Sequence, residues 1–356
     1  MICMKISVIL PTAREDHSLM GLPNTHLFEP TVRSLKNQTL TDFELIIVDN
    51  LFKARANLFA DNTFQGEKLS FPVKHIPPKP SPYLERGMWH IANDLNTGYI
   101  NADGELLFNV GDGAEFIDPT TLQKLWNYHE RKCFAHALIT YFNKGEPLFY
   151  NDVYTRLVAA TPKCEGWSYK QVIEFLDQIY KPGEAVRDSR WHIVSEQPNG
   201  VYYNAPIASW WYGYATISLE AILKLNGYDE LFDGTKGLED CDFGARLRLL
   251  GYNNLVLDSN LSVIEHWHGP VSTRVLYYSG RGWKSNYQIL QLNQLRCRSR
   301  ANAERLPKED FEFIRQKSVG CDGVTEEDTK NLLFDWWAAN QPIFDLKEER
   351  SKLCRR

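Results

Sequence analysis

Apolar and polar positions follow two periods in the first 140 residues, one typical of strands and one of helices. Short apolar runs, the first of them rich in β-branched residues, predict four buried strands, at 5–10, 43–50, 71–76 and 105–110. Helical spacing follows the first, third and fourth of these runs, at 31–38, 85–96 and 119–132. Strands that alternate with helices predict an α/β fold with a mostly parallel central sheet and helices on both faces.

The pattern changes twice after residue 140. Turn residues and aromatics give residues 141–208 no regular period apart from a helix expected at 169–180, so this range is predicted to be an irregular insertion. Regular spacing returns over 209–270, and the chain beyond it has a helical, increasingly charged pattern. We therefore expect one domain over 1–270 and a helical C-terminal extension over 271–356.

Composition and charge indicate the class of protein, although they say little about its fold. Hydrophobic residues make up 43% of the 356 residues and charged residues 24%, the balance of a soluble globular protein. A net charge of −5 gives no support for nucleic acid as a partner, and no apolar run approaches the roughly 20 residues of a membrane span. Seven scattered cysteines without a C-x-x-C pair, and a strand that leaves no room for a signal peptide, predict a cytoplasmic location.

Polar residues follow three of the predicted strands. Pro11-Thr12, Asp49-Asn50 and Gly111-Asp112 stand at their carboxyl ends, and the stretch ELLFNVGDGAEFIDP leaves Asp112 between two glycines. Because ligands of open α/β sheets bind outside the carboxyl ends of the strands, these positions are expected to border one crevice.

A second acidic group lies in GLEDCDFGARLRLLGY, residues 237–252. An apolar helical stripe begins at Phe243, so Glu239, Asp240 and Asp242 fall in the first turn of that helix. The helix dipole favours such residues by about 0.3–1 kcal/mol each, and helix capping is the simplest explanation for them. Three acids in four positions exceed what capping requires, so this turn is also a candidate site for a general base.

The strand predicted within SVIEHWHG, residues 262–269, places His266 and His268 on one side. They are either ordinary polar residues at a strand end or metal ligands that share an ion with Asp112. A tetrahedral Cys/His zinc site lacks its other ligands. The chain has no phosphate-binding G-x-x-x-x-G-K-[ST] loop and no G-x-G-x-x-G after its first strand, which disfavours ATP and dinucleotide chemistry.

Taken in order, SVILPTAR, SLKNQTLTDFELIIVDN, GELLFNVGDGAEFIDP and GLEDCDFGARLRLLGY resemble the family 2 glycosyltransferases of GT-A fold. The resemblance covers roughly residues 5–135 and 209–268, and implies a nucleotide-binding half at 1–140 and an acceptor-binding, catalytic half at 209–270. It implies inverting transfer of a sugar from a nucleotide-sugar donor, most often UDP-linked, to a hydroxyl of a glycan or glycoconjugate, as in polysaccharide biosynthesis. A divalent manganese or magnesium ion would neutralise the leaving diphosphate.

The resemblance also implies roles for particular residues. Asp240 would be the general base, and Glu239 would orient the acceptor. Residues that would bind the nucleotide are Pro11, Thr12, Arg14, Asp49, Asn50, Arg86 and Asp112. Asp112, His266 and His268 would hold the metal. Trp210 and Trp211 would stack on the acceptor sugar, although core packing explains two tryptophans at this position equally well.

The chain departs from the family where most members carry D-x-D or D-D-D. Gly111-Asp112-Gly113 keeps only the middle carboxylate, so Asp112 would bind the metal with Glu115 or a histidine, or metal dependence would be weak. The same departure supports an alternative, a catalytically weak or inactive nucleotide- or sugar-binding protein of this fold. The retained Glu239-Asp240 pair and His266 favour the active enzyme.

Overall fold

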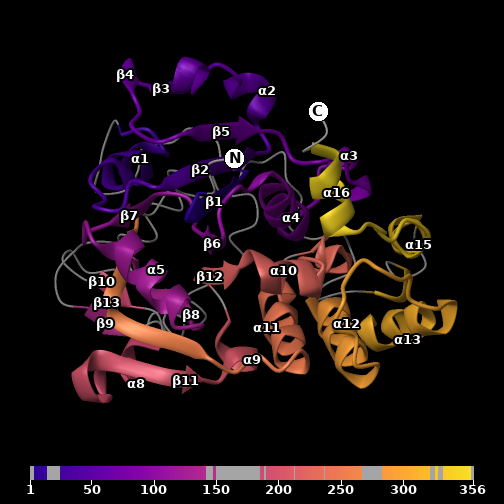
Figure 1. The fold of residues 1–356 in the computed structure, drawn as a ribbon. Helices are drawn as coiled ribbons and strands as arrows, with labels where there is room; N and C mark the ends of the chain where they lie inside the picture. Colours follow the sequence, from indigo (N-terminus) through magenta and orange to yellow (C-terminus); the bar gives the residue numbers. More distant parts are fainter. Residues whose placement is uncertain are drawn as a thin grey trace.

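A mixed sheet of eleven strands forms the centre of the computed structural model, which describes residues 4–13, 25–141, 147–149, 185–187, 190–211, 213–235, 237–266, 283–320, 325–327 and 332–353. Its main path runs β11-β13-β8-β12-β6-β1-β2-β5 (Figure 1). The strands of this path are β1 (Ile6–Thr12), β2 (Phe43–Asp49), β5 (Val73–Ile76), β6 (Leu106–Asn109), β8 (Phe134–Tyr141), β11 (Val201–Ala205), β12 (Tyr214–Ser218) and β13 (Leu255–Glu265).

Pairing differs between the two halves of this sheet. Strands β5, β2, β1 and β6 are parallel, as the apolar runs predict, with Ile6 opposite both Phe43 and Leu106. Strand β12 is antiparallel to β6 and to β8, whereas β8 and β13 are parallel. The sheet as a whole is therefore mixed, and the four predicted strands lie in its parallel half.

The range expected to be an irregular insertion also contributes strands. These are β11, which pairs with β13 at one edge, and β9 (Pro147–Phe149) and β10 (Ala185–Arg187), which lie off the main path. Strand β7 (Ala114–Phe116), which comes before this range, also lies off the main path and pairs with β13. The helix predicted at 169–180 lies outside the described residues. A separate two-stranded sheet joins β3 (Thr63–Phe64) to β4 (Glu67–Lys68).

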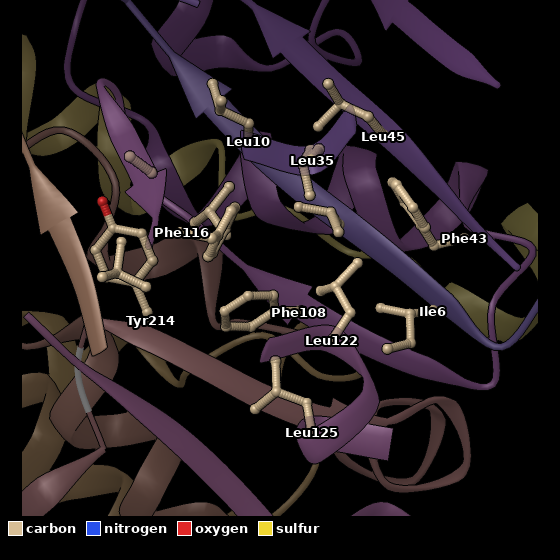
Figure 2. Close-up of a cluster of buried hydrophobic side chains, with 14 of the residues drawn as sticks. Ile6, Leu10, Leu35, Phe43, Leu45, Phe108, Phe116, Leu122, Leu125 and Tyr214 are labelled. Atoms are coloured by element: carbon tan, nitrogen blue, oxygen red, sulfur yellow. The ribbon is translucent and has the colours of Figure 1, made fainter. Parts of the chain in front are cut away.

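Side chains of β1 alternate between two apolar cores, one on each face of the sheet, and helices cover both faces. Ile6, Val8 and Leu10 face a core that includes side chains of α1 (Glu29–Lys36) and α5 (Thr121–Glu130), shown in Figure 2. Ile9 faces the other core. That core is built on α4 (Ile91–Asn101), α8 (Arg190–Ser195), α9 (Ile207–Trp210), α10 (Leu219–Leu225) and α11 (Glu239–Leu249).

The helix predicted at 85–96 is two helices in the structure. Helix α3 (Pro82–Glu85) ends before Gly87, whose φ of +65° interrupts helical backbone, and α4 begins at Ile91. Asp233 accepts hydrogen bonds from the backbone N–H groups of Ala92 and Asn93, at 3.0 Å each, and so caps α4 from a distant part of the chain. The sequence around residue 90 carries no sign of this remote cap.

The C-terminal extension is helical and packs on the domain, as Figure 1 shows. Its helices are α12 (Trp283–Leu295), α13 (Lys308–Ser318), α15 (Leu332–Ala339) and α16 (Leu346–Leu353). Buried Trp337 and Phe311 share a third apolar cluster with Tyr83 and Phe232 of the domain. No helix of the described residues is both long enough and apolar enough to cross a membrane.

Candidate functional site

A pocket of about 290 Å³ opens where strands β1, β2 and β6 end and helices α4 and α11 begin. Its lining draws on segments from residue 11 to residue 265, so distant parts of the sequence meet there. The polar and charged side chains of the lining are Thr12, Asn50, Trp89, His90, Asp94, Asn109, Asp112, Tyr214, Tyr228, Glu239, Asp240 and Glu265.

Strand ends form one wall of the pocket. Pro11, Thr12 and Asn50 line it, as expected from their positions after β1 and β2. The Asn50 side chain donates to the Thr12 carbonyl oxygen at 2.9 Å and to Asp94 Oδ2 at 2.8 Å. These bonds join the two strand ends to α4 and fix the Asn50 amide at the pocket edge.

Asp112 lines the pocket beside a carboxylate that the sequence did not point to. Glu265, at the end of β13, also lines it and accepts a hydrogen bond of 3.0 Å from the Tyr214 hydroxyl. Gly111 leaves room next to Glu265 and Tyr214, because a Cβ there would lie 3.4 Å from Glu265 Oε2 and 3.0 Å from the Tyr214 hydroxyl. A side chain at residue 111 would therefore crowd this wall.

Glu239 and Asp240 line the pocket from the first turn of α11. Leu238 precedes them with a φ of +71°, a conformation that is costly for a bulky residue, after Gly237 with a φ of +103°. Burial raises the pKa of Asp240 above its usual 3.8, and its Oδ1 accepts a hydrogen bond of 2.7 Å from the Cys241 backbone. A raised pKa makes this carboxylate a stronger proton acceptor.

The third acidic residue of this turn has a different environment. Asp242 is fully buried, forms a 2.5 Å ion pair with Arg246, and accepts a 2.7 Å hydrogen bond from Asn293 of α12. It lies outside the pocket lining. The acidic first turn thus combines two residues that face the pocket with one that ties α11 to the C-terminal extension.

Asp49, a predicted nucleotide ligand, does not line the pocket. Its carboxylate is fully buried, 3.3 Å from Arg55 and 2.9 Å from His75, and it also accepts a hydrogen bond from the Leu51 backbone. Asn50, the first residue after β2, lines the pocket.

Three other predicted residues also lie away from the pocket lining. The Arg86 guanidinium lies 3.9 Å from the centre of the Trp336 ring. His266 is paired with Glu115 at 2.6 Å on the opposite side of β13 from Glu265, so the structure does not place it with Asp112 in the lining. Trp211 is 1% exposed and packs on Phe134, which is the core role that the sequence left open.

Arg14, His268 and the side chain of Trp210 lie outside the described part of the structure. Among the pocket residues that the sequence did not single out are His90, Asp94, Asn109, Tyr214 and Glu265. His90 and Asp94 are four residues apart at the start of a helix, a spacing that favours contact between their side chains, so their pairing could have been predicted. For Glu265 the only signal is strand alternation: it immediately precedes His266, so its side chain is expected on the other side of the chain.

The donor set of the pocket fits a hard divalent cation. Asp112 and Glu265 offer carboxylate oxygens, and magnesium or manganese is often held by one or two carboxylates together with substrate phosphates. Within the described residues no cluster of three or more His, Cys, Asp or Glu side chains is arranged to hold a metal by itself. A cation here would therefore depend on oxygens from the ligand or water.

No protein-family model matches the chain, and no curated protein matches it in sequence. Solved structures are similar to it at low identity. Staphylococcus aureus TarS 1–349 in complex with UDP is 13% identical with a TM-score of 0.45, covering 88% of this chain and 70% of that one. The same protein in complex with UDP-GlcNAc is 14% identical with a TM-score of 0.47, covering 88% and 71%. GalNAc-T7 with UDP, GalNAc and Mn²⁺ is 13% identical with a TM-score of 0.46, covering 95% and 58%.

Proposed function

We propose that the protein is an inverting glycosyltransferase of GT-A fold that moves a sugar from a UDP-linked donor to a hydroxyl of a glycan or glycoconjugate. The observation that carries the proposal is the meeting of Asp240, Asp112 and the strand-end residues Thr12 and Asn50 in one pocket. The resemblance of the motifs around these residues to family 2 glycosyltransferases supports the choice of reaction and of donor.

Asp240 is the general base in this proposal. Its carboxylate accepts the proton of the acceptor hydroxyl, whose oxygen forms a bond to the anomeric carbon of the donor sugar. The bond between that carbon and the phosphate oxygen breaks, and its electron pair leaves with the nucleoside diphosphate. The raised pKa of Asp240 suits this role because the proton transfer is then more favourable. Glu239, its neighbour in the lining, orients the acceptor.

Asp112 would hold the divalent cation, with Glu265 as the second protein ligand instead of His266. The cation would neutralise negative charge on the diphosphate. Glu265 lines the same pocket as Asp112, whereas His266 is paired with Glu115 outside it.

A thermal-shift panel tests the proposal. UDP-, GDP-, CMP- and dTDP-sugars are each added with and without manganese, and UDP-sugars with manganese are expected to raise the melting temperature most. The absence of any shift across the panel would contradict nucleotide-sugar binding.

The base assignment has its own test. Asp240→Asn is expected to lower transfer by about 10⁴-fold or more while leaving the UDP-induced thermal shift intact, because only the proton acceptor is lost. Asp103→Asn, a change of an exposed carboxylate outside the pocket, serves as the matched control. Near-normal turnover by Asp240→Asn would rule out Asp240 as the base. A wild-type protein that binds a nucleotide sugar but neither transfers nor hydrolyses it would instead be a binding protein.

A further inference from the structure

The charged side chains of the pocket lining are almost all acidic. Its described side chains include five carboxylates, of Asp94, Asp112, Glu239, Asp240 and Glu265, and no lysine or arginine. A nucleoside diphosphate is itself anionic, so it would be repelled by this lining unless positive charge accompanies it. Among the described lining residues, His90 alone can carry a positive charge.

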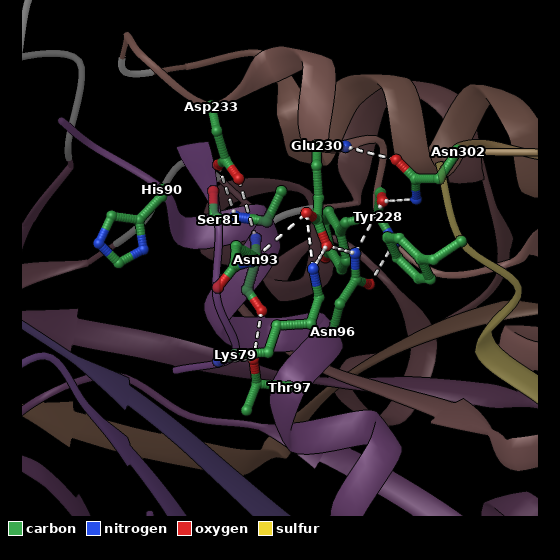
Figure 3. A network of polar contacts seen from close by, with 12 residues as sticks. Lys79, Ser81, His90, Asn93, Asn96, Thr97, Tyr228, Glu230, Asp233 and Asn302 are labelled. Carbon is green, nitrogen blue, oxygen red and sulfur yellow. Dashed lines mark hydrogen bonds and ion pairs between the residues drawn. The ribbon is translucent and has the colours of Figure 1, made fainter. Parts of the chain in front are cut away.

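His90 is held in one orientation at the pocket wall. It immediately precedes α4, is 4% exposed, and its Nδ1 lies 2.9 Å from Asp94 Oδ1. Asp94 is fixed in turn, since its Oδ2 accepts the 2.8 Å hydrogen bond from Asn50. In Figure 3 the His90 ring lies to one side of the neighbouring polar network, apart from Asn93 and Asn96. With Nδ1 engaged by Asp94, Nε2 is the ring atom left for a ligand in the pocket.

The surroundings of His90 favour its charged form. Burial alone would lower the pKa of His90, but the Asp94 carboxylate, with smaller contributions from a hydrogen bond to the His90 backbone and from Glu230, raises it above its usual 6.5. The other acidic groups around the start of α4 and the pocket are Asp233, which caps α4, and the pocket carboxylates of Asp112, Glu239, Asp240 and Glu265. Lys79 is bound to Glu230 at 2.8 Å and partly offsets that charge.

We propose that His90, oriented by Asp94, donates a hydrogen bond from Nε2 to a phosphate oxygen of the donor diphosphate. This inference rests on the proposed function and adds a protein-borne positive charge to the cation at Asp112. When the bond to the anomeric carbon breaks, the electron pair moves onto the diphosphate, and the imidazolium stabilises that charge without giving up its proton. Asp94 is the positioning residue, and His90 is the group that touches the nucleotide.

Calorimetric titration with UDP and with uridine, both in the presence of manganese, separates contact with phosphate from contact with the base. His90→Gln is expected to weaken UDP binding about 10- to 100-fold, the range for a lost charge-assisted hydrogen bond, and to leave uridine binding unchanged. His129→Gln is the matched control, because His129 is also buried and paired with a carboxylate, Glu105 at 3.0 Å, but lies outside the pocket lining.

The pH dependence gives a second measurement. Since the folded pKa of His90 lies above 6.5, the ratio of wild-type to His90→Gln affinity for UDP is expected to be greatest below that pKa. The ratio should fall towards one as pH rises through it. Asp94→Asn keeps the imidazole but removes the carboxylate that raises its pKa, so the fall should move to lower pH.

The binding measurements separate failure of the role of His90 from failure of the glycosyltransferase proposal. Equal UDP affinities of wild type and His90→Gln, or equal losses for UDP and uridine, would overturn the role of His90 while the glycosyltransferase proposal stood. Failure of the wild type to bind UDP or any other nucleoside diphosphate with manganese would overturn both. If His90→Gln does not fold, Asp94→Asn decides: an unchanged pH dependence of UDP binding would overturn the inference.

Discussion

At the ends of β2 and β13, the last residue of the strand and the residue that follows it lie in different environments. Asn50 lines the pocket, whereas Asp49 is buried against Arg55 and His75. Glu265 lines the pocket, whereas His266 is paired with Glu115. At the end of β13 the histidine that the resemblance favoured lies outside the pocket lining. At the end of β2 both residues were expected to bind the nucleotide, and only Asn50 lines the pocket.

The two carboxylates assigned to the cation can be tested singly. Glu265→Gln and Asp112→Asn are each expected to raise the manganese concentration needed for UDP binding by about tenfold or more, since each removes a charged oxygen ligand. The measurement is a manganese titration of the UDP-induced thermal shift. Glu115→Gln is the matched control, because Glu115 lies on the other side of β13 with His266. A loss confined to Glu115→Gln would place the cation on that side instead.

Part of the pocket could be predicted from the sequence. Asp112, Asn50, Glu239 and Asp240 were predictable because strand ends and a helix start place them without knowledge of side-chain direction. Which of Glu265 and His266 faces the pocket depends on the pairing of β13 with β7, a contact between segments about 150 residues apart.

Helix α4 carries Asp94 and begins immediately after His90, and its position depends on the segment between α10 and α11 (Figure 3). Asn96 donates to Glu230 at 2.8 Å and to the Tyr228 carbonyl at 3.0 Å. Gly227 permits this close approach, because a Cβ there would lie 2.2 Å from Asn96 Oδ1. Asp233 completes the connection at the helix start.

Removal of the remote cap is expected to destabilise the protein. Asp233→Ala should lower the free energy of unfolding by about 1–2 kcal/mol, because two backbone N–H groups at the start of α4 lose their acceptor. Chemical denaturation measures this change. Asp103→Ala, at an exposed carboxylate paired with Lys74, should cost much less. Equal effects of the two changes would show that the cap contributes nothing.

The parallel half of the central sheet could be predicted from local sequence pattern, whereas its mixed half could not. The strands of the parallel half lie in short, mostly apolar runs, and helical spacing follows three of the four, so these strands can be identified from local sequence. The antiparallel placement of β12 between β6 and β8, and the addition of β11 at the edge, depend on long-range pairing.

The C-terminal extension is expected to unfold together with the domain, because they share one apolar cluster. Trp337→Ala should lower the free energy of unfolding by about 3–5 kcal/mol and move the main thermal transition, since Trp337 is 3% exposed and packs edge-on against Phe311 at 5.0 Å. Leu295→Ala, at a side chain 79% exposed, is the control. A separate early transition in calorimetry, with the main one unmoved, would show that the extension unfolds independently.

The spread of the pocket along the sequence has a consequence for biosynthesis. Strands β1, β2, β5 and β6 all lie within the first 109 residues, so the parallel half is available for pairing early in translation. The helix start that carries Asp240 follows about 130 residues later, and Glu265 comes at the end of β13. A ribosome-bound chain therefore holds an incomplete pocket until β13 has emerged from the exit tunnel. Only then can the nascent protein gain stability from its ligand.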